Sequence, residues 1–359
     1  MPQAIALYTP EAPPALMEPF GPAALARNMV TALRRANFDV LMAARFMPGH
    51  GFDNERGARL RTVGAGLAAR LARRINKRPA EARPAAFLTL RINGRAPDLI
   101  APVVARACNI PYVQIRAGAA ETDPHFEIGQ RPIAMGEGAQ TEFPLFIDET
   151  PFSMAVPDAM RPSYRAMIGG GYGLDTALPW IIAPAMMRTE KLDSFRLLAA
   201  ALTKVIDRRW QIIVAGDGPA KAEVAEMLFP MGFERVRLVG TLRAATDLPA
   251  LMAAADICAW PAMGEALALA GLEAQAAGLP VVACGGTGAS GYVRMDETGL
   301  LAPPGSADIF SRRLAALLDD ADMRRRMGAA ARANVQARHA IGPAAEKLAR
   351  ILGPGKGDA

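Results

Sequence analysis

Two carboxylates stand eight positions apart inside an otherwise apolar stretch of the sequence. They are Glu265 and Glu273, in "MGEALALAGLEAQAAGLPVVA". Glutamate is seldom fully buried unless a partner pairs with its charge. If both residues were helical, about 80° would separate them around the helix, so both can line one side of a cleft. Such ionised, preorganised carboxylates accept hydrogen bonds from sugar hydroxyls. A helix that merely reaches the surface twice would also explain the pattern.

Two cations lie just before another expected helix. Arg188 and Lys191, in "MMRTEKLDSF", follow the apolar run "WIIAPAMM" and stand just before a helix expected to begin near Lys191 or Leu192. The N-terminus of a helix disfavours cations and attracts anions. Two cations beside it therefore favour a diphosphate site, whereas the simpler alternative is a pair of ordinary surface cations.

The elements that must position these residues alternate between strand and helix in both halves of the chain. The expected strands are "AIALY", "DVLMAA", "AAFLTLRI" and "YVQIR", then "WIIAPAMM", "WQIIVAG", "VRLVG", "DICAW" and "LPVVAC". This alternation predicts an α/β fold of two Rossmann-like, doubly wound parallel-sheet domains. It lapses over 116–144, which is polar and contains proline and glycine. Ligands of open parallel sheets bind beyond the carboxyl ends of the strands, so the loops that follow strands carry the chemistry.

The length of 359 residues suits two domains. We place an N-terminal domain at 1–150, a linker region at 151–177 and a C-terminal domain at 178–338. A final helix and tail occupy 339–359.

Two other motifs have plain explanations. Gly286, Gly288 and Gly291 have G-x-G-x-x-G spacing after a strand, but the chain turns too soon for the helix that a dinucleotide site requires. Asp320 and Asp322 lie where one helix ends and the next begins, which favours a helix cap over a metal site.

Taken together, the motifs resemble the donor-binding half of the GT-B glycosyltransferases, specifically the large retaining family 4 (glycosyl transferases group 1). The resemblance is carried by "GEALALAGLEAQAAGLPVVA", "TGLLAPPG", "MMRTEKL", "VAGDGP" and "VRLVGTL", and covers roughly 178–340. The N-terminal half matches more loosely and is divergent and shortened. The resemblance implies two domains that face a cleft.

By this resemblance Glu273 would hold the ribose hydroxyls of a nucleotide-sugar, and Glu265 would contact the transferred sugar. Arg188 and Lys191 would neutralise the diphosphate, which is electrostatic catalysis and needs no metal or other cofactor. The remaining donor-side residues are Gly216, Thr241 and Leu242, with Thr241 and Leu242 facing the base, and the backbone of Ala268 and Leu269 against the diphosphate.

The sequence departs from the family at several positions. Gly21 is the only glycine in the loop after the first strand, where the family usually has several. Where a histidine is common on the sugar or acceptor side, the stretches "LTLRINGRAPD" and "VQIRAGAAE" have arginines such as Arg91 and Arg116. Ala268 stands where a glycine normally approaches the phosphate.

The net charge of +6 is unevenly spread. Residues 56–78 contain eight cations and no acid, on a stretch with apolar residues at helical spacing. This predicts an amphipathic basic helix, either an ordinary solvated helix or a peripheral contact with anionic lipid. Nucleic acid is disfavoured, because no aromatic residues interleave with the charges.

The sequence has three scattered cysteines, three scattered histidines and no long apolar run, which favours a cytoplasmic protein without a metal site. A place at the inner face of the membrane is compatible with this. We therefore expect a retaining glycosyltransferase that acts on a saccharide or lipid-linked acceptor in surface polysaccharide or glycolipid assembly. A non-catalytic, nucleotide-sugar-binding or partner-supporting relative is the alternative, and an epimerase of the same architecture is a more distant one.

Overall fold

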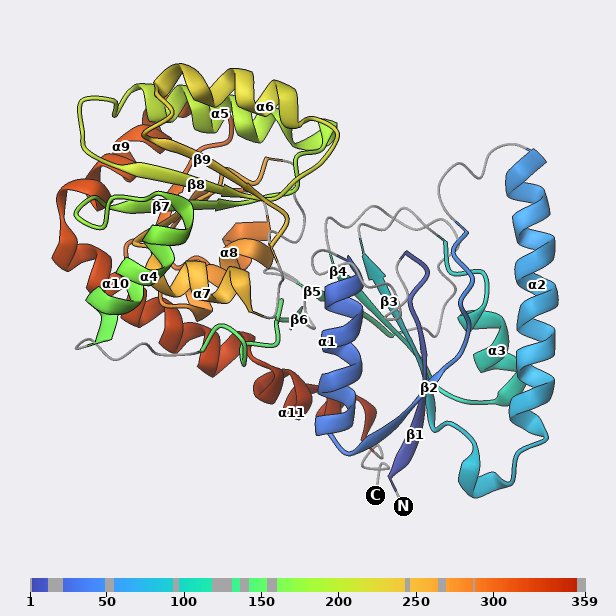
Figure 1. The fold of residues 1–359 in the computed structure, drawn as a ribbon. Coiled ribbons are helices and arrows are strands. Elements are labelled where there is room, and N and C mark those ends of the chain that lie inside the picture. The colour runs from blue at the N-terminus through green and yellow to red at the C-terminus, as the bar shows by residue number, and fades with distance from the viewer. Residues whose placement is uncertain are drawn as a thin grey trace. The chain divides into compact units, whose positions relative to one another are not determined.

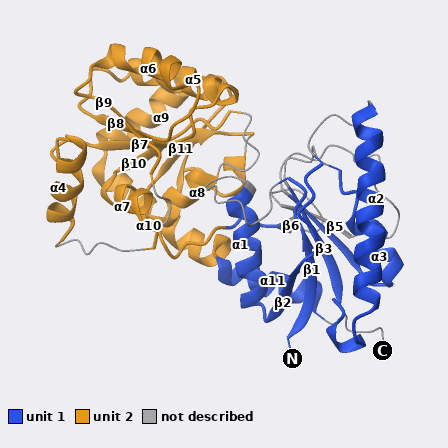
Figure 2. Cartoon of the chain, turned by 45° about the vertical axis from the view of Figure 1, so that its right-hand side comes forward, with its two compact units in different colours: residues 1–146, 341–359 blue, residues 147–340 orange. Residues whose placement is uncertain are grey.

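The computed structural model describes most of the chain. The described residues are 2–11, 22–48, 55–92, 97–117, 131–135, 142–153, 160–242, 246–263, 269–286 and 288–353. The chain divides into two compact units, one of residues 1–146 with 341–359 and one of residues 147–340 (Figure 2). Each unit is a parallel sheet covered by helices (Figure 1), so the predicted α/β class is confirmed.

Unit 1 has a six-stranded parallel sheet in the order β2-β1-β3-β4-β5-β6. Helices α1 and α11 pack together on one face of it, and α2 and α3 on the other (Figure 1). The strands are β1 (Gln3–Tyr8), β2 (Phe38–Met42), β3 (Ala86–Ile92), β4 (Tyr112–Ala117), β5 (Arg131–Met135) and β6 (Glu142–Phe143). The helices are α1 (Pro22–Arg35), α2 (Glu55–Asn76), α3 (Ala101–Cys108) and α11 (Ile341–Leu352).

Unit 2 has a second six-stranded parallel sheet in the order β12-β11-β10-β7-β8-β9. Its strands are β7 (Trp180–Pro184), β8 (Gln211–Ala215), β9 (Val236–Gly240), β10 (Ile257–Ala259), β11 (Val281–Cys284) and β12 (Gly299–Ala302). Helices α5 (Leu192–Thr203), α6 (Lys221–Leu228) and α9 (Ala307–Asp319) lie on one face. Helices α4 (Arg161–Tyr172), α7 (Asp247–Ala254), α8 (Leu269–Ala276) and α10 (Ala321–Asn334) lie on the other.

The central strands of unit 2 are apolar because helices cover both faces of the sheet. All five residues of β7 are buried, and so are all five of β8. Strands of this kind appear in a sequence as continuous hydrophobic runs, which is why the alternation of strands and helices could be recognised from the sequence.

The stretch 116–144, where the sequence pattern lapses, contributes the strands β5 and β6 to the sheet of unit 1. The sequence did not indicate them. β5 reads "RPIAM" and β6 has two residues, so neither presents the apolar run that marks a buried parallel strand.

The stretch assigned to a linker, 151–177, contains α4, which packs on α7 within unit 2. Arg165 of α4 fixes this contact. Its guanidinium donates to the Ala254 carbonyl at 2.7 Å and to the Asp256 carboxylate at 2.9 Å, and lies 3.9 Å from the Trp180 ring centroid. The C-terminal helix α11 packs against α1 in unit 1.

Among the described residues, no helix is both long enough and apolar enough to span a bilayer.

Candidate functional site

Most of the residues expected to bind a donor lie at the carboxyl ends of four neighbouring strands of unit 2. β10, β7, β8 and β9 are adjacent and parallel, so the loops that follow them emerge at one edge of the sheet. Arg188 follows β7 and Gly216 follows β8. Thr241 and Leu242 follow β9, with Thr241 exposed and Leu242 buried.

Gly216 lies where two of these loops approach too closely for a side chain. Its φ is +155°, and a Cβ there would stand 1.9 Å from the carbonyl oxygen of Ala185. Its N–H donates to the Gly240 carbonyl at 2.8 Å. Gly216 therefore joins the loops after β7, β8 and β9, and glycine is required by this packing.

The backbone next to Arg188 is fixed by the same loops. The Met187 N–H donates to the Asp217 carbonyl at 3.0 Å, and the Ala220 N–H donates to the Met187 carbonyl at 2.9 Å. A Cβ on Gly218 would lie 2.2 Å from that same Met187 carbonyl oxygen. The position of Arg188 is therefore set by backbone contacts rather than by its own side chain.

Arg188 and Lys191 lie together at the start of α5. Arg188 is exposed, and the described residues place no carboxylate within ion-pair distance of it. A 3₁₀ turn over Thr189–Lys191 follows, and the Lys191 N–H donates to the Arg188 carbonyl at 2.9 Å. Lys191 is the N-cap of α5, and no side chain caps the helix there. Two cations and the N–H groups of a twelve-residue helix thus meet at one place, which suits an anionic ligand.

Trp260 is a site residue that sequence reasoning missed. It follows β10 directly, and its ring centroid lies 5.9 Å from the Lys191 ammonium. Phe195 of α5 packs edge-on against the ring at a centroid distance of 4.8 Å. An aromatic residue immediately after a strand, at the ligand-binding edge of the sheet, was the available signal.

Glu273 lies on α8 and is only 7% exposed. Burial raises the pKa of its carboxyl to about 8. One carboxyl oxygen, Oε2, is buried without a hydrogen-bond partner among the described residues. Burial, then the charge of Glu273, raises the pKa of the Cys258 thiol in β10, so the carboxyl lies near that strand. A buried carboxyl with an unsatisfied oxygen is costly unless a ligand supplies donors.

Three of the predicted site residues, Glu265, Ala268 and Gly21, lie outside the described residues. The angular relation expected between the two glutamates therefore stays a prediction. Leu269 begins α8 and is buried. Gly278, two residues after the last residue of α8, has φ +85°, the left-handed conformation that glycine often adopts just past the end of a helix.

The two arginines of unit 1 are neighbours in the sheet. Arg91 of β3 and Arg116 of β4 are register partners across adjacent parallel strands, near their carboxyl ends. Arg91 is 3% exposed, and the Arg116 Nε donates to Oε1 of Gln114. The structure thus brings together two cations that the sequence places 25 positions apart.

The two motifs with plain explanations behave as expected. In the described residues between β11 and β12, the helical segment is a 3₁₀ helix over Gly288–Gly291, so within them the glycine pattern opens no dinucleotide-binding helix. The Asp320 carboxylate accepts a hydrogen bond from the Met323 N–H at 2.8 Å and caps α10.

With this geometry described, comparisons with known proteins become informative. Residues 179–320 match the family model for glycosyl transferases group 1. A glycosyltransferase from Rickettsia africae superposes with a TM-score of 0.71 at 16% identity, covering 98% of this chain and 97% of that one. The chain has the GT-B fold. A second GT-B neighbour, the Anabaena protein HepE solved in complex with UDP, gives a TM-score of 0.68 at 16% identity, covering 98% and 99% of the two chains.

The curated relatives of this GT-B chain are glycosyltransferases. Alpha-D-kanosaminyltransferase of Streptomyces kanamyceticus is 27% identical over 54% of this chain. The GDP-mannose-dependent alpha-(1-6)-phosphatidylinositol monomannoside mannosyltransferase of Mycobacterium tuberculosis is 30% identical over 61% of this chain. The matches span 50% and 57% of the lengths of these relatives, so the chain aligns with about half of each.

Proposed function

We propose that this protein transfers a sugar from a nucleoside diphosphate sugar to an acceptor hydroxyl. The observation that most directly supports this proposal is that Arg188, Lys191 and the N-terminus of α5 lie together at the carboxyl edge of the sheet of unit 2. This edge lies inside the segment that matches group 1 glycosyl transferases.

The chemistry expected of this edge is stabilisation of a departing diphosphate. Negative charge grows on the diphosphate as its bond to the sugar breaks. The backbone that carries Arg188 and Lys191 and the N–H groups of α5 are in place before that charge develops, so the two cations are available to the departing diphosphate. We propose that these groups replace a metal ion in the reaction.

Glu273 is the proposed holder of the ribose. Two ribose hydroxyls donating to its carboxylate would satisfy the oxygen that is buried without a partner. Thr241 and Leu242 would lie against the base. We assign the contact with the transferred sugar to Glu265, and the contact with the diphosphate to the backbone at Ala268 and Leu269.

The proposed reaction retains the configuration of the sugar. The acceptor oxygen attacks from the face that the diphosphate leaves, its new bond to the sugar carbon forms as the old carbon–oxygen bond breaks, and its proton passes to the departing phosphate oxygen. No separate base is then needed.

We propose a saccharide or lipid-linked acceptor, as in surface polysaccharide or glycolipid assembly. Arg91 and Arg116 are adjacent in the sheet, which favours an acceptor that carries negative charge. We place the protein in the cytoplasm, where its three free thiols would stay reduced.

Helix α2 supports a peripheral membrane contact of a mainly electrostatic kind. It buries its small and apolar face, including Ala68, Leu71 and Ile75, in unit 1. The exposed face keeps the cations Arg56, Arg59, Arg61, Arg70, Arg73 and Arg74, and the exposed Lys77 follows the helix directly. Since the apolar face is already used, binding to anionic vesicles should weaken steeply with salt.

Slow hydrolysis of nucleotide-sugars by the purified protein tests the proposed activity. UDP, GDP and ADP sugars are incubated with the intact protein and with an Arg188→Ala variant, each with and without EDTA. We expect one donor to be hydrolysed, more slowly by the variant, and at an unchanged rate with EDTA. A donor that binds but is never hydrolysed or transferred would instead support a non-catalytic binding protein.

A further inference from the structure

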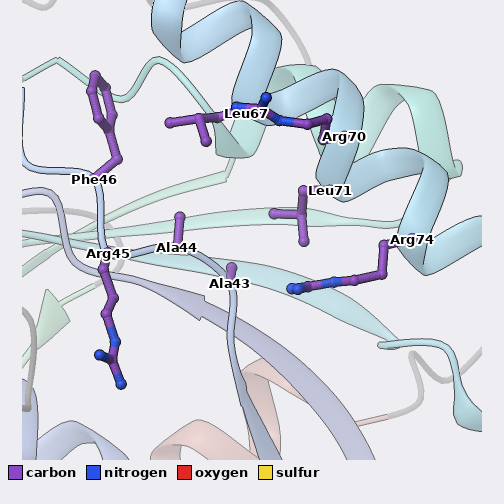
Figure 3. Close-up of a pocket in the computed structure, with 8 residues that line it drawn as sticks. All are labelled: Ala43, Ala44, Arg45, Phe46, Leu67, Arg70, Leu71 and Arg74. Atoms are coloured by element: carbon purple, nitrogen blue, oxygen red, sulfur yellow. The ribbon is translucent and has the colours of Figure 1, made fainter.

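Unit 1 contains a pocket of about 530 Å³ between α2 and the segment that follows β2 (Figure 3). Its lining residues are Ala43, Ala44, Arg45, Phe46, Leu67, Arg70, Leu71 and Arg74. The volume falls in the range typical of small-molecule sites, about 300–1,000 Å³. No role assigned above uses this pocket.

The walls of the pocket are apolar. Ala43 and Leu71 belong to the hydrophobic core of unit 1, and Leu67 and Phe46 pack against that core. Apart from three arginines, every lining residue is alanine, leucine or phenylalanine. The lining therefore offers no carboxylate, hydroxyl or amide side chain of the kind that recognises a sugar.

Three arginines complete the lining. Arg70 and Arg74 project from α2, one turn apart, and Arg45 lies on the facing segment with its guanidinium directed away from α2 (Figure 3). Within the part of the chain that the structure describes, none of the three has a carboxylate within ion-pair distance. Guanidiniums bind phosphate and carboxylate groups through paired hydrogen bonds.

Both walls are held in place independently of any ligand. The Ala43 N–H donates to the Leu7 carbonyl at 2.9 Å, and the Tyr8 hydroxyl donates to the Phe46 carbonyl at 2.7 Å. On the other wall, α2 is tied to α3 because Nδ2 of Asn76 donates to the Ala107 carbonyl at 3.2 Å. A preformed pocket binds its ligand without the cost of ordering the walls.

We propose that this pocket binds an anionic amphiphile, namely the apolar chain of a lipid with its phosphate or carboxylate against Arg70 and Arg74. The apolar walls take the chain, and the guanidiniums take the charge. The other exposed cations of α2 lie on the same helix as Arg70 and Arg74. A lipid taken from an anionic membrane surface bound by these cations would therefore reach the pocket beside this helix. The proposal deepens the membrane contact proposed above and does not depend on the transferase reaction.

Calorimetric titration with decyl phosphate below its micelle concentration tests the pocket directly. Inorganic phosphate tests the anion alone, and decyl maltoside tests the chain alone. We expect decyl phosphate to bind at least about ten-fold more tightly than either. Loss of one charged hydrogen bond costs decyl maltoside about that factor, and inorganic phosphate lacks the chain, of which burial of two methylene groups is worth about as much. Equal binding of inorganic phosphate would overturn the proposal, because the apolar walls would then contribute nothing.

Variants locate the binding on the protein. Arg70→Gln combined with Arg74→Gln should weaken decyl phosphate about ten-fold or more. The matched control is Arg59→Gln combined with Arg73→Gln, two exposed arginines of the same helix that do not line the pocket. An equal loss of affinity for decyl phosphate in both double variants would contradict binding in the pocket and indicate a diffuse effect of surface charge.

Filling the pocket with Ala44→Trp should abolish binding while every arginine remains. Leu67→Gln is the second variant in case the tryptophan prevents folding, and thermal unfolding checks that both variants are folded.

Two results distinguish this proposal from the proposed membrane contact and the proposed transferase activity. Anionic vesicles that bind without any binding of decyl phosphate leave the membrane contact standing and overturn the pocket. Decyl phosphate that binds while no nucleotide does leaves the pocket standing and removes the transferase.

Discussion

The ammonium of Lys191 lies over the ring of Trp260, 5.9 Å from its centroid. The two residues follow different strands, β7 and β10, which are neighbours in the sheet of unit 2. An aromatic face attracts a cation electrostatically, so the ring helps to fix the ammonium at the start of α5. Trp260 is thus a positioning residue for a cation expected to bind the diphosphate.

Replacing Trp260 should weaken the binding of a nucleoside diphosphate more than that of its nucleoside. The Trp260 ring is buried but the Lys191 ammonium is partly exposed, so the cation–π attraction is worth about 0.5–1 kcal/mol and Trp260→Leu should lower affinity about two- to five-fold. Trp260→Phe keeps a ring and should recover most of the loss. Calorimetric titration of both ligands measures the difference. An equal loss of affinity for the nucleoside would point to a packing defect.

Arg188 should matter for the diphosphate without mattering for the fold. Its side chain is exposed, so Arg188→Ala should leave the unfolding temperature nearly unchanged. Loss of a charged hydrogen bond costs about 1.5–3 kcal/mol, so nucleoside diphosphate affinity should fall by about ten- to a hundred-fold. Arg196→Ala is the control, since Arg196 lies on α5, the helix that Arg188 precedes, and pairs with Asp193 at 2.6 Å. If both variants bind equally well, the diphosphate lies elsewhere.

Glu273 should make the protein less stable as the pH rises. The pKa of its carboxyl is about 8 in the fold and near 4.5 when solvated. Between these values the folded protein holds a proton that the unfolded chain has released, so the free energy of unfolding falls with pH and levels off above about 8. Glu273→Gln lacks this dependence.

Thermal unfolding from pH 5 to pH 9 makes that comparison. Between pH 5 and pH 9, the free energy of unfolding of the variant should rise by a few kcal/mol relative to that of the wild type. A constant difference between the two proteins would show that the carboxyl does not titrate there.

Nucleotide binding should release a proton near pH 7. Ribose hydroxyls that donate to the Glu273 carboxylate stabilise its charged form and so lower its pKa from about 8. Calorimetry in buffers of different ionisation enthalpy counts the released protons. Wild type should release a fraction of a proton per nucleotide and Glu273→Gln none, whereas proton uptake by the wild type would refute the ribose contact.

Gly216 should tolerate no side chain. A Cβ there would stand 1.9 Å from a backbone carbonyl oxygen, so Gly216→Ala must shift the loops after β7 and β8. We expect a loss of stability of about 2 kcal/mol or more, and weaker nucleotide binding. Gly170→Ala in α4 is the control, because nothing lies within 4 Å of its added Cβ and alanine favours a helix by about 1 kcal/mol. A Gly216→Ala protein as stable as the wild type would contradict the packing.

The sequence predicted nine of the twelve strands that the structure describes, all but β5, β6 and β12, and the positions that follow them. Buried parallel strands appear as apolar runs, and the cations at 188 and 191 stood out because they precede a helix. The strands β5 and β6 could not be found this way, since "RPIAM" and a two-residue strand lack that signature.

The depth of Glu273 could not be read from the sequence. Nearly every residue of α8 is buried, so the helix has no polar stripe to show which side faces the sheet. Trp260 was overlooked because it reads as the end of the strand "DICAW" rather than as part of the loop. The adjacency of Arg91 and Arg116 depends on strand register, which no local pattern specifies.

Calorimetric titration of UDP, GDP and ADP into the intact protein and into a Glu273→Ala, Arg188→Ala double variant is the most direct test of a donor site on unit 2. We predict that one nucleotide binds the intact protein and that its binding disappears in the folded double variant. Binding of none of the three to the intact protein, or equal binding to both proteins, would contradict the assignment.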